Sequence, residues 1–204
     1  MKIVFGNQKG GVGKSTLCVM LANYLTFIKK KKVLVLDMDF QKSIHQMRES
    51  DALAQGEMPY KIYPIETADY PKYASEINNV DDIILIDLPG RLDDKTLFPI
   101  LLEADYIITP FDYERQTFAS TMTFAQFIRY IDKNKKVFFV PNKFKTNINY
   151  ALKDTMTEQL SEYGTITKPI TDRVTLKRMN TFEINEDQKK IVETVFDFIY
   201  KNIK

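Results

Sequence analysis

Short apolar runs alternate with longer amphipathic segments along the whole chain. Runs such as 33–36 and 83–86 contain only aliphatic residues, which is typical of strands covered on both faces of a sheet. The predicted strands are 3–5, 33–36, 60–65, 83–86, 106–110, 136–140 and 165–170.

The amphipathic segments repeat their apolar residues at helical spacing. The predicted helices are a first helix that begins near Ser15, followed by 41–55, 70–77, 114–131, 147–162 and 186–203. Acidic residues lie in and beside the last helix, whereas a helix that binds a membrane surface is expected to have a basic polar face. We therefore expect the apolar side of this helix to pack on the core. Strands that alternate with helices predict a single α/β domain over residues 1–204, with a doubly wound, mostly parallel sheet and helices on both faces.

The composition narrows the class of protein. Of the 204 residues, 44% are hydrophobic, which suffices for the core of one domain. A net charge of +2 limits any nucleic-acid surface to a local patch. Cys18 is the only cysteine, which excludes an internal disulfide and a site with several cysteine ligands. There is no signal peptide and no run of 18 apolar residues, so we expect a cytosolic protein with no membrane partner.

A glycine-rich segment with two lysines lies between the first predicted strand and the first helix. Glycines let successive backbone N–H groups converge on one point, and the N-terminus of the following helix adds its free amides there. In such a loop Lys14 reaches the β- and γ-phosphates, and the Ser15 hydroxyl is a ligand of Mg²⁺. The segment predicts a P-loop type nucleoside triphosphate site formed by Lys9, Gly10, Gly11, Val12, Gly13, Lys14, Ser15 and Thr16.

Carboxylates follow two of the buried strands. Asp37 and Asp39 end the run 33–36, and Asp87 ends the run 83–86. Ligands of open α/β sheets bind outside the carboxyl ends of the strands, so we expect these aspartates beside the phosphate loop. Asp87 has the place of an aspartate that holds Mg²⁺. An alternative for Asp37 and Asp39 is that they cap the helix that follows them.

The segment Asn7-Gln8-Lys9-Gly10-Gly11-Val12-Gly13-Lys14-Ser15-Thr16 resembles the deviant Walker A motif of the ParA/MinD ATPases. Gln8 stands where the commonest phosphate loop has a glycine. The resemblance implies that Lys9 is a signature lysine, which reaches the phosphates of the partner chain in a nucleotide-sandwich homodimer. A cation supplied in this way makes hydrolysis depend on dimerisation.

The same family supplies roles for residues elsewhere. Asp37-Met38-Asp39-Phe40-Gln41 resembles the family's Asp-x-Asp-Pro-Gln motif, although Phe40 replaces the proline. By this resemblance Asp39 is catalytic with Lys9 and Lys14 because it orients the attacking water, and Asp37 supports the Mg²⁺ site with Ser15 and Asp87. Asn142-Lys143 resembles the family's adenine-side motif.

A basic stretch, 171–178, resembles the ParA segment that contributes basic residues towards DNA. Its candidate DNA contacts are Arg173, Lys177 and Arg178. Lys143 and Lys145 extend this patch if their loop meets the stretch at the same edge of the sheet. The alternative is a solvated loop with no ligand.

The resemblance to this family therefore implies a ParA-like ATPase that uses ATP and Mg²⁺. It would act in partition of a plasmid, chromosome or mobile element by binding non-specific DNA as a dimer on the nucleoid. A small adaptor or centromere-binding-type protein would stimulate its slow hydrolysis. One alternative is a MinD-like or cargo-positioning switch without nucleic acid. Another is an amidoligase or iron–sulfur carrier, against which the absence of a substrate domain and the single cysteine both argue.

Overall fold

The computed structural model of the chain describes residues 1–52, 57–90 and 95–203. In this part of the chain, seven strands form one sheet in the order β3-β2-β4-β1-β5-β6-β7, and every named strand pair is parallel. The strands are β1 (Lys2–Phe5), β2 (Val33–Asp37), β3 (Lys61–Pro64), β4 (Ile83–Asp87), β5 (Tyr106–Phe111), β6 (Lys136–Pro141) and β7 (Thr165–Ile166). The predicted doubly wound parallel sheet is confirmed.

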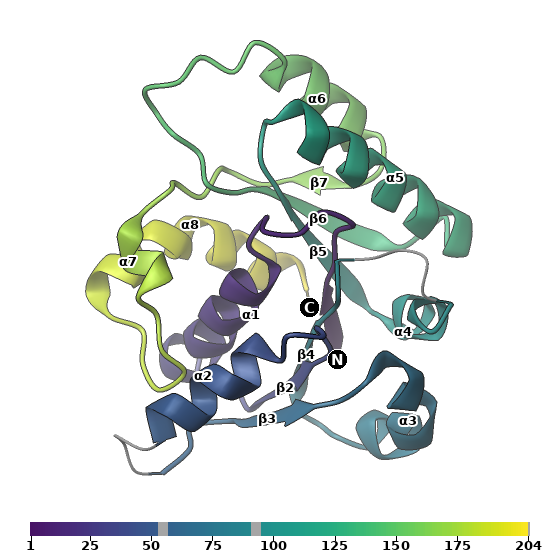
Figure 1. Ribbon diagram of the computed structural model, residues 1–204, viewed down its shortest axis with the longest axis vertical. Helices are drawn as coiled ribbons and strands as arrows, with labels where there is room; N and C mark the ends of the chain where they lie inside the picture. Colours follow the sequence, from purple (N-terminus) through teal and green to yellow (C-terminus); the bar gives the residue numbers. More distant parts are fainter. Residues whose placement is uncertain (53–56, 91–94, 204) are drawn as a thin grey trace.

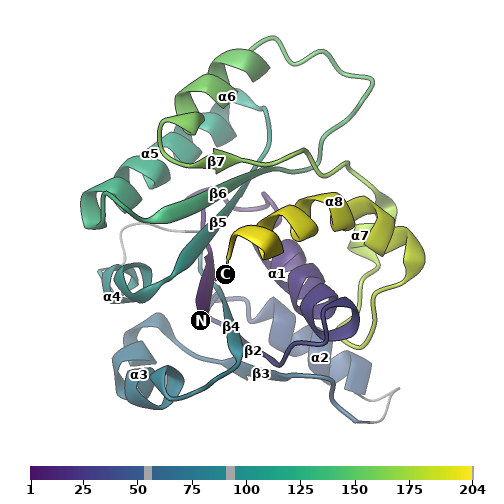
Figure 2. The ribbon, with the colours of Figure 1, turned by 180° about the vertical axis from the view of Figure 1, so that it is seen from behind.

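Helices cover both faces of this sheet (Figures 1 and 2). One face carries α1 (Lys14–Asn23), its π-helical continuation η1 (Tyr24–Ile28), α2 (Ser43–Ala52), α7 (Val174–Lys177) and α8 (Glu186–Asn202). The opposite face carries α3 (Tyr70–Asn78), α4 (Leu97–Glu103), α5 (Arg115–Ile131) and α6 (Lys153–Ser161), and the 3-10 turn η2 (Thr67–Asp69) precedes α3.

Alternation along β1 divides the interior into two cores. Ile3 and Phe5 point towards α1 and α8, whereas Val4 between them points towards α4 and α5. Helix α1 is buried from Leu17 to Asn23, because it lies against the sheet and residues of α2 and α8 pack in the same core. The apolar side of α8 packs in this core, as predicted. No helix in the described residues is long and apolar enough to cross a membrane.

The structure corrects several predicted boundaries. The segment 147–162 is helical only from Lys153, because Phe144, Tyr150 and Tyr113 pack their rings together and hold the residues before α6 as a loop. The last predicted strand, 165–170, pairs only at Thr165 and Ile166. The predicted helix 41–55 is described as α2 over Ser43–Ala52, and its last three residues lie outside the described part.

Pro64 is the last residue of β3 but does not end the pairing of its strand. The Ile65 N–H donates to the Asp37 carbonyl at 3.1 Å, one residue beyond the proline. In parallel pairing, alternate residues of an edge strand turn their N–H groups away from the neighbour. Pro64 occupies such an outward position on the edge strand β3, where its missing N–H removes no ladder bond.

This topology brings the predicted site together. All strands run the same way, so the loops after β1, β2, β4 and β6 leave from one edge of the sheet. The chain leaves β1 for α1 on one face and passes from β4 to α4 on the other, and β1 and β4 are neighbours. Ligand sites of doubly wound sheets lie where neighbouring loops diverge in this way.

Candidate phosphate-binding site

The loop between β1 and α1 has the backbone geometry of an anion cradle. Gly11 and Gly13 have φ angles of 76° and 100°, which are left-handed conformations that L side chains rarely adopt. Gly13 is also the residue before α1, and a Cβ placed on it would lie 2.3 Å from Asn142 Nδ2. Position 13 therefore requires glycine both for its conformation and for space.

Lys14 places a buried cation at this loop. Its residue is only 6% exposed, and its ammonium would lie 3.4 Å from a Cβ on Gly90, which follows β4. Burial lowers the pKa of Lys14, while the charges of Asp87 and Asp39 oppose this by raising it. A desolvated ammonium beside free helix-terminal amides is suited to binding a polyphosphate.

Three oxygen-bearing side chains meet beside Lys14. Asp37 and Asp87 end the neighbouring strands β2 and β4, opposite each other in register, and both are completely buried. The Ser15 hydroxyl donates to Asp87 Oδ2 at 2.5 Å. In the described part of the chain the Oδ1 atoms of both aspartates are buried without a hydrogen-bond partner. Buried polar atoms of this kind normally have a partner, so the pair is suited to a ligand.

These oxygens fit Mg²⁺. They are hard ligands of the type that the ion prefers, and the ion usually keeps several waters and substrate phosphates in its shell. The described residues contain no group of three or more His, Cys, Asp and Glu placed to hold a metal alone. Ser15, Asp37 and Asp87 would therefore hold the ion together with phosphate oxygens and water.

Asp37 also serves the structural role that the sequence left open. Its Oδ2 accepts hydrogen bonds from the N–H groups of Ile44 at 3.0 Å and His45 at 2.9 Å, at the start of α2. Burial raises the pKa of Asp37, and the bond from His45 and the charge of Lys42 lower it. One oxygen of Asp37 thus fixes α2, and the other remains available at the site.

Asp39 lies half-buried in the turn after β2. Its Oδ1 accepts the Gln41 N–H at 3.0 Å, so the carboxylate shapes the turn that presents it. Phe40, which replaces the family's proline, is 57% exposed. Lys42 has a positive φ of 47° and donates to the carbonyls of Ile65 at 3.0 Å and Asp37 at 3.3 Å. These contacts tie the turn to β2 and β3 without proline.

Burial of Asp87 predicts how stability depends on pH. Desolvation raises the pKa of Asp87 to about 7, although the Ser15 hydrogen bond and the charge of Lys14 lower it. Between the ordinary Asp pKa of 3.8 and about 7, the unfolded chain loses this proton while the folded protein keeps it. The free energy of unfolding contributed by Asp87 therefore falls as pH rises through this window, by at most roughly 4 kcal/mol.

Urea unfolding without nucleotide or Mg²⁺, at pH values between 4 and 8, measures this effect. We expect Asp87→Asn to gain stability relative to the parent as pH rises, because its amide needs no proton. An equal pH profile for the two proteins would contradict the assigned protonation of Asp87.

Asn142 and Lys143 lie against the phosphate loop. Asn142 Nδ2 donates to the Val12 carbonyl at 2.8 Å, and the Lys143 ammonium donates to the Gly11 carbonyl. Lys143 has a positive φ of 54°, which turns the chain sharply after β6. The structure thus brings both residues to the predicted site, while an adenine contact by either residue stays a prediction.

Asn7 belongs to the site, although no role of its own was predicted for it from the sequence. It is buried, and its side chain donates to the Pro110 carbonyl at 2.8 Å and to Thr121 Oγ1 at 2.9 Å. Its Oδ1 accepts the Lys9 N–H at 3.0 Å, which fixes the backbone where Lys9 begins. In the described residues the Lys9 ammonium has no hydrogen bond or ion pair. A polar residue two positions after a buried strand was the available signal.

The predicted basic residues lie together at the same edge. Arg173 and Arg178 flank the short helix α7, and both are exposed, as is Lys177. Phe144 forms a β-bridge with Thr171, and the Asp172 N–H donates to the Phe144 carbonyl at 3.0 Å. The loop that carries Lys143 and Lys145 therefore meets the basic stretch, which was the condition for one patch.

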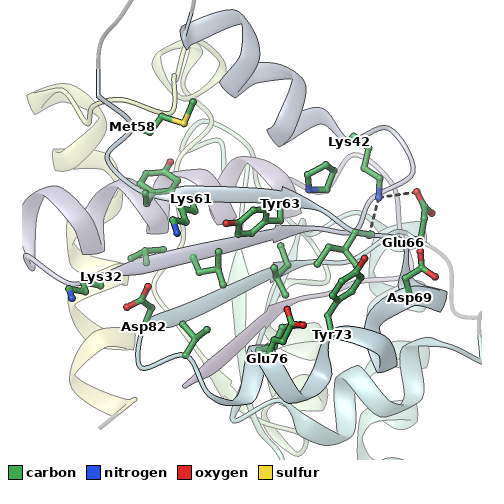
Figure 3. A pocket seen from close by; sticks show the side chains of 18 of the residues that line it. Lys32, Lys42, Met58, Lys61, Tyr63, Glu66, Asp69, Tyr73, Glu76 and Asp82 are labelled. Atoms are coloured by element: carbon green, nitrogen blue, oxygen red, sulfur yellow. Dashed lines mark hydrogen bonds and ion pairs between the residues drawn. The ribbon is translucent and has the colours of Figure 1, made fainter.

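A hollow of about 990 Å³ lies elsewhere, at the outer edge of the sheet beside β2, β3 and α3 (Figure 3). Its lining includes the large exposed rings of Tyr63 and Tyr73. It also includes Lys42, which belongs to the turn after β2. Its lining includes Lys32 and Lys61 as well as acidic residues. Because both signs of charge line the hollow, its charge does not select one class of ligand.

Comparisons with known proteins identify relatives. The family described as the CobQ/CobB/MinD/ParA nucleotide binding domain matches residues 3–185. A candidate plasmid partition protein from Borrelia burgdorferi B31 bound to AMPPNP has 25% sequence identity and a TM-score of 0.78, over 98% of each chain. No protein in the curated set matches the chain.

Two more distant solved structures share the fold. MinD in a MinC:MinD cell division complex from Aquifex aeolicus has 17% identity and a TM-score of 0.74, over 99% of this chain and 95% of that one. ParA of pNOB8 bound to nonspecific DNA has 20% identity and a TM-score of 0.63, over 99% and 96%.

Proposed function

Because the chain belongs to the CobQ/CobB/MinD/ParA family of nucleotide-binding domains, we propose that it is a ParA-like ATPase of DNA partition. It binds ATP with Mg²⁺, dimerises around the nucleotide and hydrolyses it slowly until a small adaptor or centromere-binding-type protein stimulates it. The observation that carries the nucleotide assignment is the cradle of Gly11, Gly13 and the buried Lys14 beside two unpartnered aspartate oxygens. The AMPPNP bound to the Borrelia protein supports ATP as the nucleotide.

The chemistry requires positioning more than covalent participation. Phosphoryl transfer is accelerated mainly by fixed charges around the γ-phosphate and by an oriented nucleophile. Lys14 would neutralise the β- and γ-phosphates, and Ser15, Asp37 and Asp87 would hold Mg²⁺, which would supply a second positive charge beside them. Asp39 lies in the adjoining turn, where it orients the attacking water. Lys9 supplies its charge to the partner chain's site.

DNA partition rests on the basic patch. In our proposal, dimerisation places two copies of the exposed residues Arg173, Lys177 and Arg178 on one surface. Doubling a weak electrostatic site raises its avidity for the phosphate backbone without any base contact. That the related pNOB8 ParA was solved with nonspecific DNA supports this choice.

Reversing two of these charges tests the DNA assignment. We expect Arg173→Glu with Arg178→Glu to lose retention of non-specific double-stranded DNA in the presence of ATP, while ATP affinity stays unchanged. The dependence of log affinity on log salt should also become shallower by about 0.9 for each DNA phosphate that is no longer neutralised. Filter binding between about 50 and 200 mM salt with ATP, with ADP and without nucleotide measures both effects.

The matched control reverses two exposed lysines outside the patch, Lys133→Glu and Lys190→Glu, which changes the net charge by the same amount. This control should keep ATP-dependent retention. If the parent shows no more retention with ATP than with ADP at low salt, the DNA assignment is wrong. The second candidate, a MinD-like or cargo-positioning switch, then takes its place. The likeness to MinD in a protein complex favours that candidate as the alternative.

A further inference from the structure

Asn142 and Lys143, the two residues that follow β6, hold the phosphate loop through hydrogen bonds to its backbone carbonyls. Asn142 Nδ2 donates to the Val12 carbonyl at 2.8 Å, and the Lys143 ammonium donates to the carbonyl of the preceding residue, Gly11. The side of Gly13 is closed by the same amide, because a Cβ there would lie 2.3 Å from Asn142 Nδ2. Asn142 is only 6% exposed, whereas Lys143 is exposed, so Asn142 makes the better protected contact.

Asn142 is itself firmly held. Its backbone N–H donates to the carbonyl of Phe111, the last residue of β5, at 2.6 Å, which continues the pairing with β5 one residue beyond the end of β6. A short polar side chain fixed to the sheet can hold a glycine-rich loop at a constant position. The pairing of β5 with β6 thus fixes Asn142, and through Asn142 the loop between β1 and α1, which is distant in sequence.

The hydrogen bonds to these carbonyls also determine where the N–H groups of the same peptide units point. A peptide unit is planar and trans, so its C=O and N–H groups point in opposite directions. When Asn142 holds the Val12 carbonyl, the Gly13 N–H of the same unit points away from β6. Lys143 does the same for the Val12 N–H through the Gly11 carbonyl. N–H groups fixed in this way can converge on an anion before it arrives.

We propose that Asn142 is a positioning residue for the triphosphate: it aims the loop amides and acts in the same way whatever base the nucleotide carries. This inference rests on the proposed ATP-binding function. It differs from the adenine-side role that the sequence resemblance implied, in which the Asn142 amide reads the base. The two roles predict different losses when the amide is removed.

The experiment compares ligands with and without a base. Calorimetric titrations with Mg²⁺ and ATP, GTP or inorganic tripolyphosphate are carried out on the parent, Asn142→Ala and Asn142→Asp. We expect Asn142→Ala to lose about tenfold in affinity for each of the three ligands, because the buried Val12 carbonyl is left without its donor. Asn142→Asp keeps the volume but faces the carbonyl with a carboxylate, so its loss should be larger.

Asn147→Ala is the control, since Asn147 is exposed on the same loop and should bind all three ligands as the parent does. Thermal melting without ligand separates a positioning role from a folding defect: we expect both Asn142 variants to melt cooperatively with midpoints above the titration temperature, so that each is folded while binding is measured. Unchanged tripolyphosphate affinity in both Asn142 variants, with an altered ratio of ATP to GTP affinity, would overturn the proposal in favour of base reading. A parent protein that binds neither ATP nor tripolyphosphate would instead remove the proposed function and this inference with it.

Discussion

Replacing Lys14 with alanine should lower ATP affinity by at least about 100-fold. A hydrogen bond to a charged group contributes roughly 1.5–3 kcal/mol, and the Lys14 ammonium would serve two phosphates. The loss should be large because the lysine is buried and its charge is poorly screened by water. Titration calorimetry with ATP and Mg²⁺ measures the change.

The Lys14→Ala variant should still fold. Burial already disfavours the charged lysine, as its lowered pKa indicates, so removing it relieves a desolvation cost in the protein without nucleotide. Lys31→Ala, which removes an exposed lysine between η1 and β2, is the control and should bind ATP normally. A folded Lys14→Ala protein that binds ATP within a few-fold of the parent would mean that the phosphate site is misassigned.

The sequence predicts this part of the molecule well because the responsible signals are local. Uninterrupted aliphatic runs such as 33–36 are typical of strands buried on both faces, and the structure buries both faces of β2. Glycine permits the positive φ angles of residues 11 and 13, which other residue types rarely adopt. The polar residues that directly follow these strands needed only the parallel topology to be placed at one edge.

Features that depend on contacts between distant segments were harder to predict from the sequence. Helix α4 was not predicted, because Pro99 lies within its seven residues and too few turns are present to establish a period. The loop before α6 keeps apolar residues at helical spacing, yet aromatic packing among Tyr113, Phe144 and Tyr150 determines its shape. Tertiary contacts override local propensity in such segments.

In the site, too, local signals could be recognised in the sequence, whereas contacts between distant residues could not. Asp37 could be placed from its strand, but its double use, one oxygen at α2 and one unpartnered, depends on where α2 begins. The grip of Asn142 on Val12 joins residues 130 positions apart, and no spacing in the sequence encodes it. The bridge between Phe144 and Thr171, which joins the two basic loops, could be stated beforehand only as a condition.

The second large effect concerns Lys9, which should act on the partner chain. Lys9→Ala should bind ATP but fail to dimerise or hydrolyse it, because Asn7 holds the Lys9 backbone while the ammonium has no partner in the described part of its own chain. A cation supplied across an interface accelerates related reactions by about 10³–10⁵-fold. Asp39→Ala should bind ATP and form a long-lived dimer without turnover. Size-exclusion chromatography and phosphate release measure both variants.

Mixing the two inactive variants distinguishes action across the interface from action within one chain. In a mixed dimer, the Lys9→Ala chain keeps its own Asp39 and receives Lys9 from the Asp39→Ala chain. One complete site therefore forms per mixed dimer, and hydrolysis should recover towards half of the parent rate per dimer. If Lys9 served its own chain, neither site would be complete and the mixture would remain inactive.

The control mixes Lys9→Ala with a chain that carries both substitutions, which offers no complete site in any pairing and should stay inactive. Recovery in this control would show that the assay detects something other than complementation. Undiminished hydrolysis by Lys9→Ala alone would remove Lys9 from the catalytic set. An Asp39→Ala protein that binds ATP but stays monomeric would show that Asp39 supports the dimer rather than the attacking water. The mixture thus tests the sandwich arrangement through its activity. One chain can supply Lys9 to the site that holds the other chain's Asp39 only if the two chains face each other.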